Sequence, residues 1–203
     1  MKIEDIISKV RVYGLDESVA ASKLPMAVDP DEVTPEITDR TKKLGQAKSG
    51  SGHDNFLKGI VVQFDLKVTN KLWVEMERYH FVDFVSSQSS MHRIAKFDLD
   101  QQYISYVDPR MVTIMKELVD EYNTYVKLGE TEKAKVAYLN CLYSSPAGLQ
   151  LTARLTTNYQ QLKTIYYQRR NHRLPEWRVI CQWIESLPKF KELILGEEEE
   201  IAA

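Results

Sequence analysis

The sequence has little cysteine, no long apolar segment and no excess of either charge. Its two cysteines, Cys141 and Cys181, lie forty residues apart without a CxxC pair. This excludes a thiolate zinc site, argues against a disulfide framework and favours a reduced, cytoplasmic setting. No apolar run approaches the roughly 20 residues that cross a bilayer, so we expect no membrane contact. The formal net charge is −2, which argues against a dedicated binder of duplex nucleic acid, since such proteins carry a strong basic excess.

Several motifs that would identify a catalytic class are also missing. The chain contains no GxGxxG, no GxxxxGK[ST] and no GxSxG. These absences argue against a Rossmann dinucleotide site, a P-loop and an α/β-hydrolase. Its histidines show neither HxH nor HExxH spacing, so we expect no metal site.

What is present fits one folded domain. The chain has 203 residues, of which 43% are hydrophobic and 28% charged, and this length can bury a sizeable core. We predict a single domain over residues 1–203. Within it we expect an N-terminal strand–helix segment over residues 1–50, a helical hairpin over 109–143 and a flexible acidic tail over 197–203.

Two segments alternate with a period of two, as strands with one buried face do. Residues 59–68 place five apolar side chains on one face: Ile60, Val62, Phe64, Leu66 and Val68. Residues 148–156 do the same with Leu149, Leu151, Ala153 and Leu155. A shorter strand is expected over 10–13, whereas residues 79–93 have mixed character.

Capping residues predict the helices between these strands. We expect helices over residues 17–23 after Asp16, over 35–47, after Thr69, over 109–126 and over 130–143. A further helix starts at Thr157 or Asn158 and runs to about Arg170, and another begins at Pro175.

The segment from residue 154 to 178 concentrates positive charge. It has one acid, Glu176, against six cations, a local charge of +5: Arg154, Lys163, Arg169, Arg170, Arg173 and Arg178. Such a focus attracts phosphate or carboxylate groups. Asn158 and Arg169 are eleven residues apart, about three helical turns, so both fall on one stripe. The alternative interpretation is that these cations pair with the protein's own acids on a helix surface.

A polar cluster over residues 86–90 follows the apolar run FVDFV. Its hydroxyls and amide could bind a ligand phosphate or base, although such clusters are more often loops or helix caps. His80 and His92 are candidates for acid–base chemistry or phosphate contact, while a histidine beside aromatic residues is usually structural.

Taken in order, these segments resemble the flavin-dependent thymidylate synthases over residues 51–187. GHDNFLKGIVVQFDL resembles the family's GHxSxxEHxxFxFxI strand, and YHFVDFVSSQSS resembles the signature RHRxxSxxxQS. SSP at Ser144–Pro146 resembles the LP before a strand. NYQQLKTIYYQRRNHRLPEWRVI resembles NxRxLxxFLxLRxxxxAQWEIR and keeps the Asn-to-Arg spacing of eleven.

The resemblance implies an α/β (α+β) fold with a central mixed or antiparallel sheet flanked by helices, assembled as a homotetramer. It implies that FAD and dUMP bind in clefts between subunits and that methylenetetrahydrofolate donates the carbon. Arg169 matches the arginine that binds and activates the nucleotide, and the resemblance implies that the substrate is further bound by Gln88, Ser89, Ser90 and Arg93. For the flavin, the resemblance implies contacts from Asn158, Gln160, His53, Arg78 and His80. Anchored on Ser89, His80 matches the signature histidine; anchored on the preceding strand, Arg78 keeps the first arginine.

The chain also departs from the family pattern. Family arginines fall on Met91 and Leu142, the second flavin-contacting residue is Gln160, and the family histidine of EH falls on Gly59. A charge-assisted contact is worth about 1.5–3 kcal/mol, so these losses would weaken ligand binding. Three hypotheses follow: an enzyme that alkylates a pyrimidine nucleotide at C5, a catalytically inactive relative acting as a nucleotide-binding or protein-interaction scaffold, and a helical interaction protein with an acidic partner.

Overall fold

The computed structural model describes residues 1–196, so the predicted acidic tail over 197–203 lies outside the described residues. The protein is a mixed α/β structure in which helices flank a four-stranded antiparallel sheet, and this confirms the predicted fold class. Among the described residues, no helix is long and apolar enough to span a membrane.

The sheet contains β1 (Ile7–Tyr13), β2 (Val61–Thr69), β3 (Asp83–Ser87) and β4 (Gln150–Asn158) in the order β1-β2-β4-β3. β1 pairs antiparallel with β2, with Ile7 opposite Leu66 and Tyr13 opposite Val61. The register shifts between Ser8 and Arg11, where Lys9 adopts a positive φ of 52°. β3, at one edge of the sheet, lies within residues 79–93, whose mixed character does not predict a strand.

The predicted alternation along β2 and β4 is largely confirmed. The four inward side chains of β2 are at most 3% exposed: Val62, Phe64, Leu66 and Val68. Two positions assigned outward are nevertheless buried, namely Asp65 and Gln150. Asp65 is covered because it accepts hydrogen bonds from cations on both neighbouring strands, at 2.9 Å from Lys9 Nζ and 3.0 Å from Arg154 Nη1.

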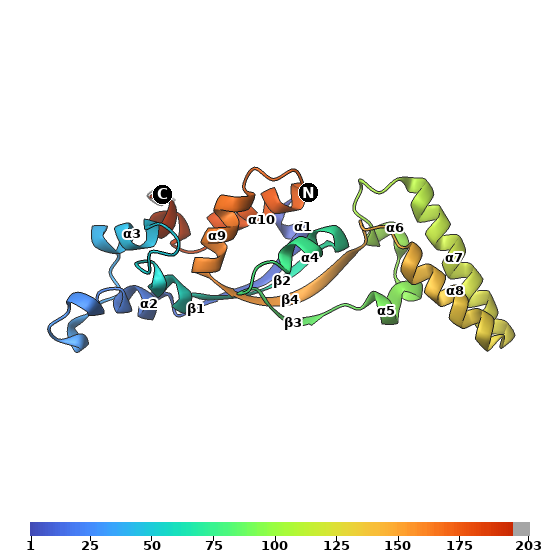
Figure 1. The fold of residues 1–203 in the computed structure, drawn as a ribbon, viewed down its shortest axis with the longest axis horizontal. Helices are drawn as coiled ribbons and strands as arrows, with labels where there is room; N and C mark the ends of the chain where they lie inside the picture. Colours follow the sequence, from blue (N-terminus) through green and yellow to red (C-terminus); the bar gives the residue numbers. More distant parts are fainter. Residues whose placement is uncertain (197–203) are drawn as a thin grey trace. The chain divides into compact units, whose positions relative to one another are not determined.

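The described chain groups into two compact units, and the prediction of a single domain stays a prediction. Among the described residues, the first unit comprises residues 1–66, 79–85 and 154–196. It holds α1 (Ile3–Ile6), α2 (Leu15–Ala21), α3 (Asp39–Gln46), α9 (Tyr159–Arg169) and α10 (Pro175–Glu185). Figure 1 shows α9 and α10 on one face of β1, β2 and β4. There Phe64 packs against Trp183 with ring centroids 4.5 Å apart.

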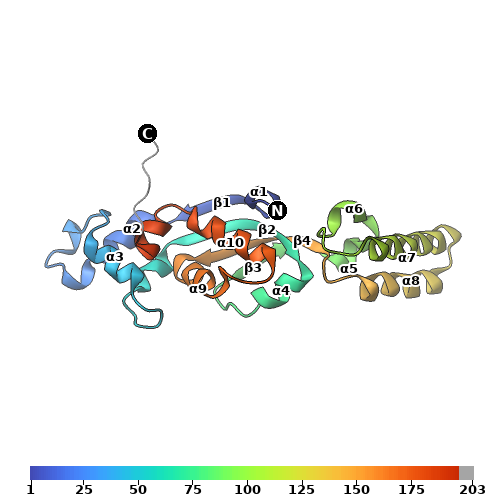
Figure 2. The same cartoon turned by 90° about the horizontal axis from the view of Figure 1, so that it is seen from above.

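The second unit comprises residues 67–78 and 86–153. It holds α4 (Asn70–Met76), α5 (Ser90–Arg93), α6 (Leu99–Gln102), α7 (Pro109–Leu128) and α8 (Thr131–Ser144). α7 and α8 form the expected hairpin (Figures 1 and 2), and α7 ends at Gly129, whose φ of 71° favours glycine. The core of this unit contains Ile94, Leu99, Tyr103, Met115, Cys141 and Leu149.

Two predicted helix starts are wrong, each for a local reason. The helix expected from Pro35 begins at Asp39, because the side chain of Thr38 accepts the backbone N–H of Thr41 and caps the first turn. The helix expected after Asp16 begins at Leu15, because Gly14 turns the chain with a φ of 69°.

Candidate functional site

Helix α9 carries the most specific sequence match and orders the candidate site of the first unit. Asn158 ends β4 and caps the helix, since its Oδ1 accepts the backbone N–H of Gln161 at 2.9 Å. The predicted buried stripe is confirmed by Leu162 and Ile165, which are 1% and 2% exposed. Arg169 stands at the last helical position, about 16 Å of helical rise beyond Asn158.

Arg169 is held by two aromatic side chains. Its Nε donates to the phenol oxygen of Tyr79 at 2.7 Å. Its guanidinium carbon lies 5.6 Å from the centre of the Tyr79 ring and 5.0 Å from that of Trp177. Both rings are buried, so the attraction between cation and π-face acts in a poorly hydrated environment. The guanidinium therefore has a fixed orientation at the end of α9.

A buried network joins the start of α9 to the chain before β2. Lys163 Nζ donates to Asp54 Oδ2 at 2.8 Å and to the carbonyl oxygens of Gly45 and Ala47 at 2.8 and 2.5 Å. The other carboxylate oxygen of Asp54 accepts from Gln160 Nε2 at 2.9 Å. The two charged side chains are 0% and 3% exposed. Nothing in the sequence singles out Asp54, and Lys163 enters the sequence analysis only as one of the six cations of the positive segment.

Beside this network lies a polar cavity of about 330 Å³. The glycine-rich loop and η3 (Asn55–Gly59) form one wall, and α9 forms another. Its lining combines amides, a hydroxyl, a cation and one aromatic ring: Gly50, Gly52, Asn55, Lys58, Phe81, Gln160, Gln161 and Thr164. Gln160 is the predicted flavin-contacting residue in this cavity. Predicted His53 lies exposed on the loop, where its backbone N–H donates to Ser51 Oγ.

The other predicted site residues are mostly on the surface. His80 is exposed in the first unit, and Arg78 and Arg93 are exposed in the second. Gln88 pairs with Thr152 twice: its backbone N–H donates to the carbonyl oxygen of Thr152, and its side-chain Oε1 accepts the backbone N–H of Thr152, both at 2.9 Å.

Ser89 occupies the position before α5, with Ser90 as the first helical residue. The prediction that this cluster includes a helix cap is right in position, although no side-chain capping hydrogen bond forms there. The two serines are half-buried.

The positive segment over 154–178 is partly neutralised within the protein. Arg154 and Lys163 pair with Asp65 and Asp54, as the alternative interpretation expected. Arg178 donates to the carbonyl oxygens of His172 and Arg173. Aromatic rings contact two further cations of the segment: Arg169 lies on the predicted stripe against Tyr79 and Trp177, and Arg170 lies over the rings of Tyr166 and Tyr167.

Neither thiol fits a catalytic role. Burial raises the pKa of Cys181 to about 12, and burial also raises the pKa of Cys141. Both thiols therefore stay protonated at neutral pH, whereas only the thiolate is an effective nucleophile. Among the described residues, no cluster of histidine, cysteine or acidic side chains could hold a metal ion.

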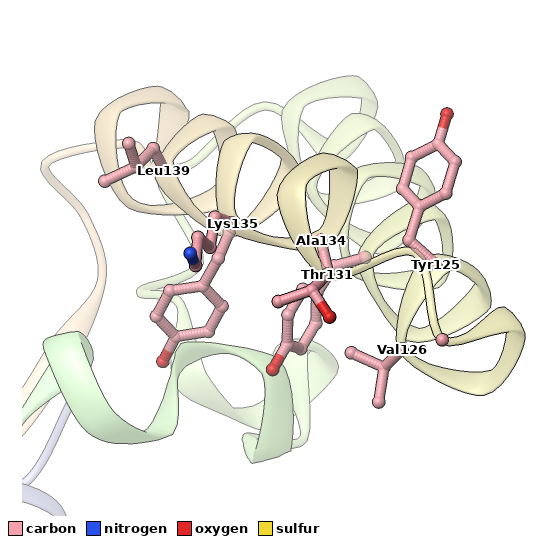
Figure 3. A pocket seen from close by; sticks show the side chains of 9 residues that line it. Tyr125, Val126, Thr131, Ala134, Lys135 and Leu139 are labelled. Atoms are coloured by element: carbon pink, nitrogen blue, oxygen red, sulfur yellow. The ribbon is translucent and has the colours of Figure 1, made fainter.

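A second, larger cavity of about 610 Å³ lies on the helical hairpin of the second unit (Figure 3). Aromatic and aliphatic side chains line it: Tyr122, Tyr125, Val126, Gly129, Thr131, Ala134, Lys135, Tyr138 and Leu139. It contains none of the predicted site residues.

Comparison with known proteins gives a fold and no sequence family. No family model and no curated protein sequence matches the chain. A solved structure of the flavin-dependent thymidylate synthase ThyX from Helicobacter pylori, complexed with FAD and dUMP, is similar with a TM-score of 0.66 and 11% identity, covering 92% of this chain and 100% of that one. Another ThyX structure from H. pylori with FAD and dUMP has the same TM-score and identity, covering 90% and 95%. The chain therefore has a ThyX-like fold.

Proposed function

We propose that this protein binds a pyrimidine nucleotide and FAD and alkylates the pyrimidine at C5. The observation that carries the proposal is the fixed guanidinium of Arg169. It lies at the end of the helix that Asn158 starts, with the spacing of the motif it resembles, in a chain whose fold is similar to a protein complexed with FAD and dUMP.

Arg169 has the chemistry that a pyrimidine nucleotide requires. A guanidinium offers several donors in one plane, which suit a pyrimidine carbonyl or a phosphate. Because its orientation is held by Tyr79 and Trp177, little conformational freedom would be lost on binding. Hydrogen bonds from a cation to the pyrimidine oxygen would favour attack at the ring carbon by stabilising the charge that develops.

The cavity beside α9 is lined by polar side chains of the kinds that can bind the polar atoms of a flavin. Amides of Gln160 and Asn55 can pair with ring nitrogens and oxygens, Phe81 offers an apolar surface, and Lys58 can approach a diphosphate. When bound, the flavin would supply a hydride. Methylenetetrahydrofolate would donate a methylene carbon to C5, which would lose its proton, and the hydride would reduce that carbon to a methyl group. The protein would act as a cytoplasmic homotetramer with sites shared between subunits.

FAD titration followed by visible spectroscopy and thermal unfolding tests the cofactor. The proposal expects bound flavin absorption and a higher Tm with FAD, together with exchange of the C5 proton of dUMP in deuterated water. Failure of FAD to bind or to raise the Tm would overturn it. Light scattering tests the tetramer, since a helical interaction protein would be a monomer or dimer.

Arg169→Ala tests the nucleotide contact, with Arg173→Ala as its matched control because Arg173 is an exposed arginine of the same segment. Loss of a charge-assisted contact worth about 1.5–3 kcal/mol should weaken dUMP binding by about 10- to 100-fold. The control should bind like the wild type. Equal affinities for both variants would remove Arg169 from the site.

A catalytically inactive relative is the second candidate, and the contacts of Gln88 and Gln160 favour it. Both side chains make hydrogen bonds within the chain, to Thr152 and Asp54. A ligand would have to share or displace these bonds. This candidate expects dUMP binding without C5 exchange in the presence of FAD and a reductant.

A further inference from the structure

A glycine-rich loop over residues 48–53 forms one wall of the polar cavity beside α9, through Gly50 and Gly52. All six residues of this loop are exposed, so no buried side chain of its own holds its shape. Both glycines adopt a positive φ, 86° and 80°, which glycine reaches as readily as a negative φ. Backbone amides of Ser51 and His53 donate to acceptors within the loop, and these contacts are local. The position of this wall therefore depends on how the two ends of the loop are fixed.

One buried side chain, that of Lys163 on α9, fixes both ends. An ammonium group has three N–H donors, and Lys163 Nζ has three oxygen acceptors. Before the loop, at 2.8 and 2.5 Å, it meets the carbonyl oxygens of Gly45 and Ala47, where α3 ends and the last backbone acceptors have no partner within the helix. After the loop, it meets Asp54 Oδ2 at 2.8 Å. Residues 48–53 thus lie between two attachments to the same nitrogen atom.

The carboxylate of Asp54 also holds a residue of the opposite wall. Its Oδ1 accepts a hydrogen bond from Gln160 Nε2 at 2.9 Å, and Gln160 on α9 lines the cavity. Lys163 and Asp54 are 3% and 0% exposed, and neither is among the lining residues of the cavity. The buried pair can therefore act on a ligand of the cavity through the loop and through Gln160, without touching the ligand.

We propose that Lys163 is a positioning residue that holds the glycine-rich loop in the shape that receives the ligand of this cavity. The inference rests on the proposed function, because it takes FAD as that ligand. A wall that is ordered in advance loses little conformational freedom when the ligand binds. A loop released from Lys163 would have to be ordered by the ligand, and FAD affinity would fall because of that entropic cost.

Asp54→Asn combined with Lys163→Met tests this role without a change of net charge. The double variant leaves no unpaired ion in the interior and keeps an oxygen for Gln160, but it removes the donor to Gly45 and Ala47. We expect it to bind FAD about tenfold or more weakly, which corresponds to ordering the backbone of about one residue. Hydrogen exchange of residues 47–54 should be faster than in the wild type, and FAD should slow it more in the variant than in the wild type.

Asp100→Asn combined with Lys116→Met is the matched control, because it removes an exposed ion pair of the second unit and is also neutral in net charge. The control should bind FAD like the wild type and show wild-type exchange in the loop. If Lys163 were merely structural, the first double variant would have altered stability but wild-type FAD affinity. That result, or loop exchange as slow as in the wild type, would overturn the inference.

Trypsin cleavage of the wild type decides the question if the double variant does not fold. Lys48 provides an exposed cleavage site within the loop, and we expect slow cleavage after it both with and without FAD. Rapid cleavage that FAD suppresses would show that the ligand orders the loop, contrary to the role of Lys163. A wild-type protein that binds no FAD would overturn the proposed function, while exchange and cleavage without FAD would still decide whether Lys163 holds the loop.

Discussion

The buried pair of Lys163 and Asp54 gives the sharpest prediction about stability. Lys163→Met preserves most of the side-chain volume but leaves the Asp54 carboxylate buried with Gln160 as its remaining hydrogen-bond partner among the contacts described above. It also removes the donor to two backbone carbonyl oxygens, those of Gly45 and Ala47. The substitution therefore affects both the charge balance and the attachment of the segment before β2.

The expected cost is large because the pair is fully covered. Removal of one partner of a buried ion pair costs about 3–5 kcal/mol, since the remaining charge has lost its compensation. A domain of this kind is stable by about 5–15 kcal/mol, so the loss is a substantial share of the total. Asp54→Asn combined with Lys163→Met removes both charges and keeps an oxygen for Gln160. We expect the double variant to recover most of the loss.

Urea unfolding followed by circular dichroism measures these differences. Lys116→Met is the matched control: Lys116 Nζ lies 2.7 Å from Asp100, but the two side chains are 45% and 63% exposed. An exposed pair is worth about 0–1 kcal/mol, so the control should unfold near the wild-type midpoint. Equal losses for Lys163→Met and Lys116→Met would refute the reasoning that burial determines the cost.

Three other predictions concern single residues. Burial raises the pKa of Cys181 from 9.0 to about 12. Between these two values the folded state keeps the thiol proton that the unfolded state has lost, so the free energy of unfolding should fall as pH rises from 9 toward 12. Cys181→Ala should reduce this pH dependence in urea titrations. The hydrogen bond from Lys9 is the main cause that lowers the pKa of Asp65 below 3.8. The ionised Asp65 therefore stabilises the fold above that pH, and this stabilisation is lost in more acidic solution. Asp65→Asn should consequently show a smaller fall of Tm on acidification. Gly45→Ala should lower stability by about 1–3 kcal/mol in thermal unfolding, because the new Cβ would overlap the carbonyl oxygen of Leu193. At Gly50 the added Cβ would meet open space, so Gly50→Ala should lower stability only through the strain of alanine at a positive φ.

The sequence predicted elements whose signal is local. Thr69 and Asn158 cap α4 and α9 as expected, because an N-cap needs only its own side chain and the next turn. The alternation along β2 and β4 is also a local signal, and it is confirmed apart from the buried Asp65 and Gln150. β3 was missed because all five of its residues are exposed, so no buried face produces a period of two.

The parts of the candidate site that escaped prediction depend on distant contacts. Asp54 and Lys163 are 109 positions apart, and neither side chain signals burial by its neighbours in sequence. The hydroxyl of Tyr79 is likewise assigned a partner only by the packing of α9. Local charge counting therefore overstated the positive segment, since it could not see which cations the fold neutralises. The roles of the individual site residues stay predictions.

The resemblance places family arginines on Met91 and Leu142, and these two positions differ in what an introduced arginine would cost. Leu142 packs against the hydrophobic core of the second unit, so Leu142→Arg would place a charge against apolar side chains and lower stability. Met91 is 58% exposed and contributes its backbone carbonyl to Tyr138, which a substitution leaves intact. Met91→Arg should therefore change the free energy of unfolding by less than about 0.5 kcal/mol.

Because Met91→Arg leaves folding intact, its effect on dUMP affinity reports on the site itself. If the position contacts the nucleotide, the added cation should strengthen dUMP binding by about tenfold or more at low salt, and higher salt should reduce the gain. Met91→Gln is the neutral control of similar length. A gain in affinity that brings C5 exchange with it would show that a missing cation limited turnover. Unchanged affinity in Met91→Arg would place the nucleotide away from this position and leave Arg169 as the principal cation of the site.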